Sequence, residues 1–217
     1  MIIDCVSDLH GFVPELLGGD LLIIAGDLTA HDDEDEHEEF KEWLLKQDYK
    51  RKILIAGNHD NHIQSGRLPR YDDGIDYLED SGIEFEGLKI WGAPWSAWFK
   101  GVNPKCKAFM KREKQLEKHW EKIPVNTDIL ITHGPAYGIR DGIPNMYDGT
   151  MFHAGSKSLS AYLLYHSHPL IHIFGHIHEG YGMQETFPRT YGKLESINCS
   201  LVNEYYKPVN KPIRIIL

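Results

Sequence analysis

The stretch PLIHIFGHIHEGYG, residues 169–182, is central to the interpretation of this chain. An apolar run ends at Gly175, and two histidines, His176 and His178, follow one residue apart. The chain has 13 histidines, so such a pair can arise without any function. The alternative is that each imidazole binds a metal ion. The side chains that follow the other apolar runs distinguish these two interpretations.

Four further apolar runs also end in side chains that can bind metals. These are Asp8 and His10 after MIIDCV, Asp27 after LLIIA, Asn58, His59 and Asp60 after KILIA, and His133 after DILI. In α/β sheets, ligands gather beyond the carboxyl ends of the strands. The sequence therefore predicts that these residues converge, although they are spread over 170 positions.

The donor atoms of this set indicate the kind of metal. Without His59 and Asp60, the set holds two aspartates, one asparagine and four histidines, and no thiolate. Nitrogen and oxygen donors suit Mn, Fe, Zn or another divalent ion, rather than Cu(I) or an iron–sulfur cluster. Seven ligands exceed one tetrahedral zinc and suit two ions that share a carboxylate. Such pairs act on phosphoryl substrates.

The order of the apolar runs predicts an α/β fold of two packed mixed β-sheets flanked by helices, in a single domain over residues 1–217. Helices are expected near 34–47, 105–120 and 157–167, and the glycine-rich stretch 134–158 is expected to be a functional loop. Strands are expected at Ile2–Val6, Leu21–Ala25, Lys52–Ala56, Leu88–Trp91, Ile129–Thr132, Leu170–Phe174, Ser196–Val202 and Ile213–Leu217.

Composition narrows the choice of partners. The net charge of −9 disfavours duplex nucleic acid, because phosphate backbones would be repelled. One basic segment, residues 100–114, is interpreted as the solvated face of a helix. No apolar run reaches about 18 residues and no signal peptide is recognised, so no membrane contact is expected. Three widely separated cysteines favour a reducing cytoplasm.

The ordered motifs D-x-H, GD, GNHD, H and GHxH resemble those of the calcineurin-like metallophosphoesterase superfamily. The stretches WGAPW (91–95), DILITHGP (128–135) and HIFGHIHEGYG (172–182) are similar to the MPPED-type phosphodiesterases, as is the C-terminal sequence KPVNKPIRIIL. The resemblance covers nearly the whole chain. It implies the αββα sandwich of that superfamily.

The resemblance also implies a role for each ligand. Asp27 would bridge two divalent ions, with Mn²⁺ as the first choice and Fe, Zn, Ni or Co as alternatives. The first ion would take Asp8, His10 and His178, and the second would take Asn58, His133 and His176. Some animal members carry glycine in place of His176, so its presence here implies a complete dinuclear centre.

The expected reaction is hydrolysis of a small phosphodiester, such as a cyclic nucleotide or another small nucleotide diester, by a metal-bound hydroxide. His59 would bind the phosphate or protonate the leaving alkoxide, and Asp60 would orient His59. Trp95 and Arg140 are weaker candidates for substrate contacts, with a buried aromatic and a surface ion pair as their alternatives.

Two other functions stay open from the sequence. One is a nuclease or a nucleic-acid end-processing phosphatase of the same superfamily. The other is a non-enzymatic protein-interaction module on the same fold. The oligomeric state is not indicated.

Overall fold

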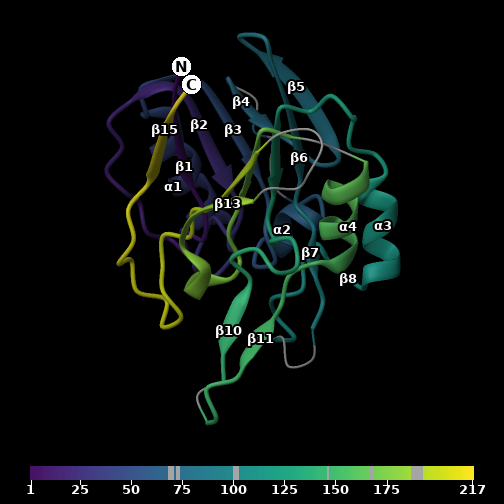
Figure 1. Cartoon of the computed structure of the whole chain (residues 1–217). Coiled ribbons are helices and arrows are strands. Elements are labelled where there is room, and N and C mark those ends of the chain that lie inside the picture. The colour runs from purple at the N-terminus through teal and green to yellow at the C-terminus, as the bar shows by residue number, and fades with distance from the viewer. Residues whose placement is uncertain (68–70, 72–73, 100–102, 146, 167–168, 187–192) are drawn as a thin grey trace.

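Two mixed β-sheets pack face to face in the computed structural model, and helices cover their outer faces (Figure 1). The structure describes residues 1–67, 71, 74–99, 103–145, 147–166, 169–186 and 193–217. The two packed mixed sheets with helices on their outer faces confirm the predicted fold class. No helix in these ranges is long and apolar enough to span a membrane.

The first sheet has the strand order β15-β1-β2-β3-β4. Strands β1 to β4 are parallel, and β15 pairs antiparallel with β1 at the edge. The carboxyl ends of β1, β2 and β3 therefore lie at one edge of the sheet. The bounds are β1 Ile2–Val6, β2 Gly19–Ala25, β3 Tyr49–Ile55, β4 Ile75–Tyr77 and β15 Ile213–Ile216.

The second sheet has the strand order β13-β14-β12-β9-β6-β5. Its four central strands are parallel, and its two edge strands run antiparallel to their neighbours. The bounds are β5 Ser81–Phe85, β6 Leu88–Ala93, β9 Ile129–Thr132, β12 Ile171–Phe174, β13 Gly182–Thr186 and β14 Leu194–Asn198. An isolated parallel bridge between Ser7 and Ser200 joins the ends of β1 and β14, which brings the carboxyl ends of the parallel strands of both sheets together.

Alternating burial along the strands produces three apolar layers. In β2, Leu21 and Ile23 face the second sheet, whereas Leu22 and Ile24 face helix α1, Glu34–Leu45. On the other side, the second sheet packs against α3, Glu113–Trp120, and α4, Lys157–Tyr165, which lie side by side (Figure 1). Because strand side chains alternate between faces, each continuous apolar run supplies two layers at once.

Three details differ from the expectations. Helix α3 begins at Glu113 rather than near 105, because the preceding segment forms a turn and a short strand, β8 (Met110–Lys111), which pairs with β7 (Ser96–Ala97). The stretch 134–158 is not a continuous loop, since it contains a hairpin of β10 (Gly142–Pro144) and β11 (Met151–His153). Strand β14 ends at Asn198 rather than Val202.

Two short helical segments complete the fold, α2 (Asn61–Gln64) after β3 and η1 (His178–Gly180) after β12. The expected helix end at 167, residues 100–102 of the basic segment, and residue 146 of the expected loop lie outside the described residues.

Candidate metal centre

Strand ends from both sheets deliver the candidate ligands to one place. Asp8 follows β1, Asp27 follows β2 and Asn58 follows β3 in the first sheet. His133 follows β9 and His176 follows β12 in the second sheet. Backbone hydrogen bonds join these turns, because Asp8 N donates to Gly26 O at 2.9 Å and Gly175 N donates to His133 O at 3.0 Å.

Four of the candidate ligands adopt a left-handed backbone conformation that is uncommon for residues other than glycine. The φ angles are 51° at Asp8, 44° at His10, 55° at Asp27 and 67° at His176. Such conformations cost free energy and occur frequently at functional sites. The turns are also crowded, since a Cβ atom on Gly57 would lie 2.2 Å from Asp27 Oδ1 and one on Gly175 would lie 2.1 Å from Asp8 Oδ2. Glycine at both positions permits the close approach.

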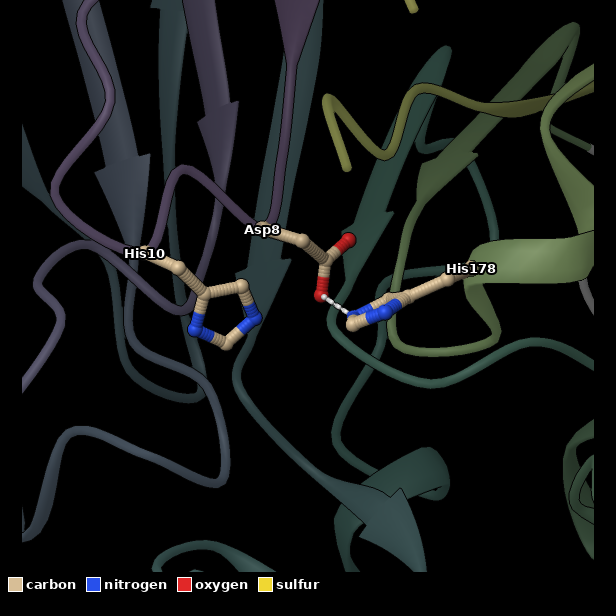
Figure 2. Close-up of side chains that lie close together, drawn as sticks. All are labelled: Asp8, His10 and His178. Carbon is tan, nitrogen blue, oxygen red and sulfur yellow. Dashed lines mark ion pairs between the residues drawn. The ribbon is translucent and has the colours of Figure 1, made fainter. Parts of the chain in front are cut away.

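Asp8, His10 and His178 form the first group (Figure 2). The Nε2 atom of His178 lies 3.5 Å from Asp8 Oδ1. The ring centroids of His10 and His178 are 5.4 Å apart in an edge-to-face arrangement. One ligand atom from each residue lies within 4.8 Å of the others, which is the spacing needed to surround a single ion.

Asn58, His133 and His176 form the second group. The Oδ1 atom of Asn58 lies 2.9 Å from His133 Nε2 and 2.7 Å from His176 Nδ1. All three side chains are largely withdrawn from solvent, and His133 is fully buried.

Asp27 lies between the two groups. Its Oδ2 atom is 3.7 Å from His10 Nε2, and its Oδ1 atom is 3.4 Å from His133 Nε2. Asp27 also shares a cluster with Asp8 and His133. The structure thus brings all seven predicted ligands together, with one carboxylate in the position to contact both groups.

Backbone carbonyl groups hold three of these ligands in orientation. His133 Nδ1 lies 2.8 Å from Ala25 O, and His178 Nδ1 lies 3.1 Å from Asn203 O. Each of these rings therefore donates through Nδ1 and presents Nε2 to the site, beside Asp27 for His133 and beside Asp8 for His178. The Nδ2 atom of Asn58 donates to Cys106 O at 3.4 Å, which directs its carbonyl oxygen toward the histidines. The 103–109 segment, for which the sequence suggested no role, supports the site in this way.

The residues fit a pair of divalent ions. Among the described residues, His10 Nε2 and His176 Nε2 are buried and have no hydrogen-bond partner in the protein. Buried polar atoms normally have a partner, and a bound metal ion would supply it here. Burial lowers the pKa of His10 to about 4 and that of His176 to about 3, so both rings are neutral. Burial opposes ionisation of Asp8, but the hydrogen bond and charge of His178 and the charge of His133 lower its pKa to about 2. Burial opposes protonation of His133 and His178, but Asp27 raises the pKa of His133 to about 9 and Asp8 raises the pKa of His178. Because metals bind neutral imidazoles and ionised carboxylates, a bound ion would displace a proton from each of these two rings.

His59 lies at the open side of this centre. Its backbone N–H donates to Asp27 Oδ1 at 2.8 Å, and its Nε2 atom lies 3.9 Å from Asp27 Oδ2. Its ring is 4.6 Å from that of His10, measured between centroids. The imidazole is partly exposed and lines the adjoining cavity.

Asp60, which was expected to orient His59, binds backbone groups of two turns. Its fully buried carboxylate accepts hydrogen bonds from the backbone N–H groups of Gly57 at 2.6 Å, Asp27 at 3.0 Å and Leu28 at 3.1 Å. Asp60 therefore ties the turn after β3 to the turn after β2. Its burial, and then the charge of Asp27, raise its pKa.

The two weaker candidates lie away from the cavity. Trp95 is buried, its indole N–H donates to Asp80 Oδ1 at 2.7 Å, and its ring packs at a tilt against His119. Arg140 donates to Tyr181 O at 3.1 Å and to Met183 O at 2.5 Å, which ties the turn before β10 to η1 and β13. Both side chains are engaged in the fold, so these positions argue against direct substrate contacts.

A cavity of about 250 Å³ opens beside the two groups. Several residues that line this cavity were not predicted from the sequence, because nothing in their local pattern distinguishes them from ordinary loop residues. These additional lining residues are Phe99, Asn103, Cys106, Ile143, Ile177, Glu179, Glu204 and Tyr206. Glu204 and Tyr206 lie in the loop that precedes β15, just before the C-terminal sequence KPVNKPIRIIL.

Comparison with known proteins agrees with this geometry. The sequence profile of the family described as "Calcineurin-like phosphoesterase" matches residues 1–180. The human protein "Metallophosphoesterase domain-containing protein 1" is 34% identical over 240 residues, which covers 98% of this chain and 70% of that protein. A "Probable glycerophosphodiester phosphodiesterase GpdQ" of Arcobacter nitrofigilis is 27% identical over 182 residues, which covers 81% of this chain and 61% of that protein.

Solved structures show the same fold. The crystal structure of the protein TT1561 of Thermus thermophilus matches with a TM-score of 0.56 at 12% identity, covering 90% of this chain and 88% of that one. At this identity the likeness concerns the fold alone. The extent of the profile match and the identity to the human protein establish the relationship, and the chain belongs to the calcineurin-like phosphoesterase family.

Proposed function

We propose that this protein is a dinuclear-metal phosphodiesterase that hydrolyses a small phosphodiester, with a cyclic nucleotide or another small nucleotide diester as the first candidate. The observation that carries this proposal is Asp27, whose carboxylate lies between two groups of imidazoles and oxygen donors. Membership of a phosphoesterase family supports hydrolysis of a phosphate ester. The name of the Arcobacter nitrofigilis relative supports a diester.

The chain's own residues would divide the work. Asp8, His10 and His178 would hold one ion, Asn58, His133 and His176 the other, and Asp27 both. Bound divalent ions supply Lewis acidity, which neutralises phosphoryl charge and makes water nucleophilic at neutral pH. Mn²⁺ remains the first choice, because the donors are nitrogen and oxygen atoms without thiolates.

His59 is the residue placed to move a proton. It belongs to neither ligand group described above, although it forms a further cluster with His10 and Asp27, and its imidazole lines the cavity beside His10. From there Nε2 can donate a hydrogen bond to a phosphate oxygen, or pass its proton to the leaving alkoxide. Protonation of the leaving oxygen is worth typically about 10²–10⁴-fold in rate.

The size and charge of the site favour a small substrate. A cavity of about 250 Å³ suits a compact ester rather than a duplex. The net charge of −9 also disfavours long nucleic acids. Three free cysteines, two of them buried, support placing the protein in a reducing cytoplasm.

The test is hydrolysis of bis-p-nitrophenyl phosphate by the metal-free chain after addition of Mn²⁺. We expect activity in the wild type and roughly a 10²-fold or greater loss in His59→Ala, with manganese content unchanged. His31→Ala, on an exposed histidine, is the matched control and should keep full activity. His176→Gly should fold but bind about one manganese ion fewer.

Two results would contradict the proposal. An inactive wild type that binds two ions would favour a non-enzymatic module. Cleavage of DNA strands without cleavage of small diesters would favour a nuclease.

A further inference from the structure

One wall of the cavity is acidic and aromatic. We use the name acidic wall for Glu179, Glu204 and Tyr206, which line the cavity together with the metal centre. Glu179 comes from η1, and the other two come from the loop between β14 and β15. Both glutamates line the cavity and are solvent-exposed, and no described salt bridge neutralises either of them.

The loop holds Tyr206 rigidly against the centre. Tyr206 has a left-handed φ of 56°, and its N–H donates to Asn203 O at 2.8 Å. The Asn203 side chain accepts from the N–H groups of Tyr205 and Lys207 at 3.1 and 3.0 Å. The Tyr206 ring makes T-shaped contacts with the rings of His10 and His178, with centroid distances of 4.8 and 5.1 Å. A residue held in this strained position beside two metal ligands is placed to contact substrate.

The charges on the cavity walls are unevenly distributed. Among the described residues, no lysine or arginine lines the cavity, whereas three carboxylates do. Asp27 belongs to the metal centre, so Glu179 and Glu204 are the carboxylates left to contact the organic part of a substrate. An aromatic ring with carboxylates beside it is the arrangement that binds ammonium groups.

We propose that the acidic wall selects phosphodiesters in which one alcohol carries a quaternary or primary ammonium group. This inference rests on the proposed function, because it assigns a substrate class to the same cavity. The anionic phosphate would lie at the metal centre, and the ammonium group would lie against Tyr206, Glu179 and Glu204. In hydrolysis, water adds its oxygen to phosphorus, the bond from phosphorus to the other alcohol's oxygen breaks, and that alcohol leaves with the electron pair and a proton.

The test compares two substrates of equal shape and different charge. One is p-nitrophenyl phosphorylcholine, and the other is p-nitrophenyl 3,3-dimethylbutyl phosphate, in which carbon replaces the ammonium nitrogen. Release of p-nitrophenolate reports both, in the Mn²⁺-loaded full chain. We expect kcat/KM to be roughly five-fold higher for the choline ester in the wild type.

Variants identify the groups responsible. The measured quantity is kcat/KM for the choline ester divided by kcat/KM for its carbon isostere. Glu179→Gln and Glu204→Gln should each lower this ratio by about three-fold. Tyr206→Leu should lower the same ratio, and Tyr206→Phe should retain it because the ring face remains. Glu39→Gln, on the exposed face of α1, removes the same charge elsewhere and should leave the ratio as in the wild type.

The outcomes separate the two proposals. If the wild type hydrolyses both esters equally and the glutamate variants do not change the ratio, the ammonium selection is wrong while the phosphodiesterase function stands. If the wild type hydrolyses neither these esters nor bis-p-nitrophenyl phosphate, the proposed function fails and the selection fails with it.

Discussion

His172 in β12 shows how one buried residue couples folding to pH. Its side chain is fully buried, and Nε2 lies 2.8 Å from the Thr132 hydroxyl, which itself donates to Gly134 O at 2.7 Å. Nε2 is therefore the protonated nitrogen, and Nδ1 has no partner among the described residues. A proton on Nδ1 would place an unpaired charge in the interior. Burial accordingly lowers the pKa of His172 from 6.5 to about 3.

This shift gives the sign of a pH effect. Between pH 6.5 and about 3 the unfolded chain binds a proton at His172 that the folded chain excludes, so stability falls as the pH falls. From about pH 7 to about pH 5 this residue should cost roughly 2 kcal/mol of the free energy of unfolding. We expect His172→Gln to lose less stability than the wild type over this interval, in urea unfolding of the metal-free chains. Equal losses in the two chains would show that His172 is not the group responsible.

At individual positions, the types of the candidate ligands were predictable and their backbone conformations were not. Aspartate, asparagine and histidine after apolar runs indicated metal chemistry from the sequence alone. The left-handed turns at Asp8 and His176 carry no local signal, because tertiary hydrogen bonds between the loops impose them. The backbone partners of Asp60 on the neighbouring turn were not predictable for the same reason.

Among the helices and strands, the loops after β2 and β3 behave as one unit. The Asp60 carboxylate joins them through three backbone N–H groups in a fully buried position. Asp27 and Asn58 project from these two loops, so the spacing between the two ligand groups depends on this connection. Strand and helix positions were largely predicted, whereas α3 was predicted too long because Phe109 and Leu116 pack into one apolar layer from different elements.

Removing this connection should affect both stability and metal binding. We expect Asp60→Ala to lower the free energy of unfolding by roughly 3 kcal/mol, because buried N–H groups lose their acceptor. Mn²⁺ affinity, measured by calorimetry, should fall as well. Asp60→Asn keeps one acceptor oxygen and should fall between the wild type and Asp60→Ala on both measurements. An Asp60→Ala chain with unchanged stability would contradict this role.

Across the fold as a whole, one apolar layer lies between the two sheets. Ile131 in β9 is fully buried within it, among residues of both sheets. The layered class was predictable because apolar runs covered on both faces require stacked layers of helix and sheet. The edge strands β5 and β13 and the hairpin of β10 and β11 were not predicted, since short, partly exposed strands depend on their neighbours for stability.

The contribution of this layer is measurable. Ile131→Ala should lower the free energy of unfolding by about 2–5 kcal/mol, through lost transfer energy and the cavity left behind. Ile131→Val should cost about 0.5–1.5 kcal/mol. Ile216→Ala, at an exposed position in β15, should change stability by less than about 0.5 kcal/mol. Urea unfolding checks all three, and equal effects at Ile131 and Ile216 would show that the inter-sheet layer is not the main source of stability.

The pairing of β15 with β1 places the two chain termini next to each other, at the end of the first sheet opposite the cavity (Figure 1). Ile2 pairs with Ile216 at the amino end of β1, whereas the metal ligands follow its carboxyl end. Any tag, tether or neighbouring polypeptide joined at either terminus therefore departs from the side remote from substrate entry. A short linker between the termini would close the backbone into a ring without crossing the catalytic opening.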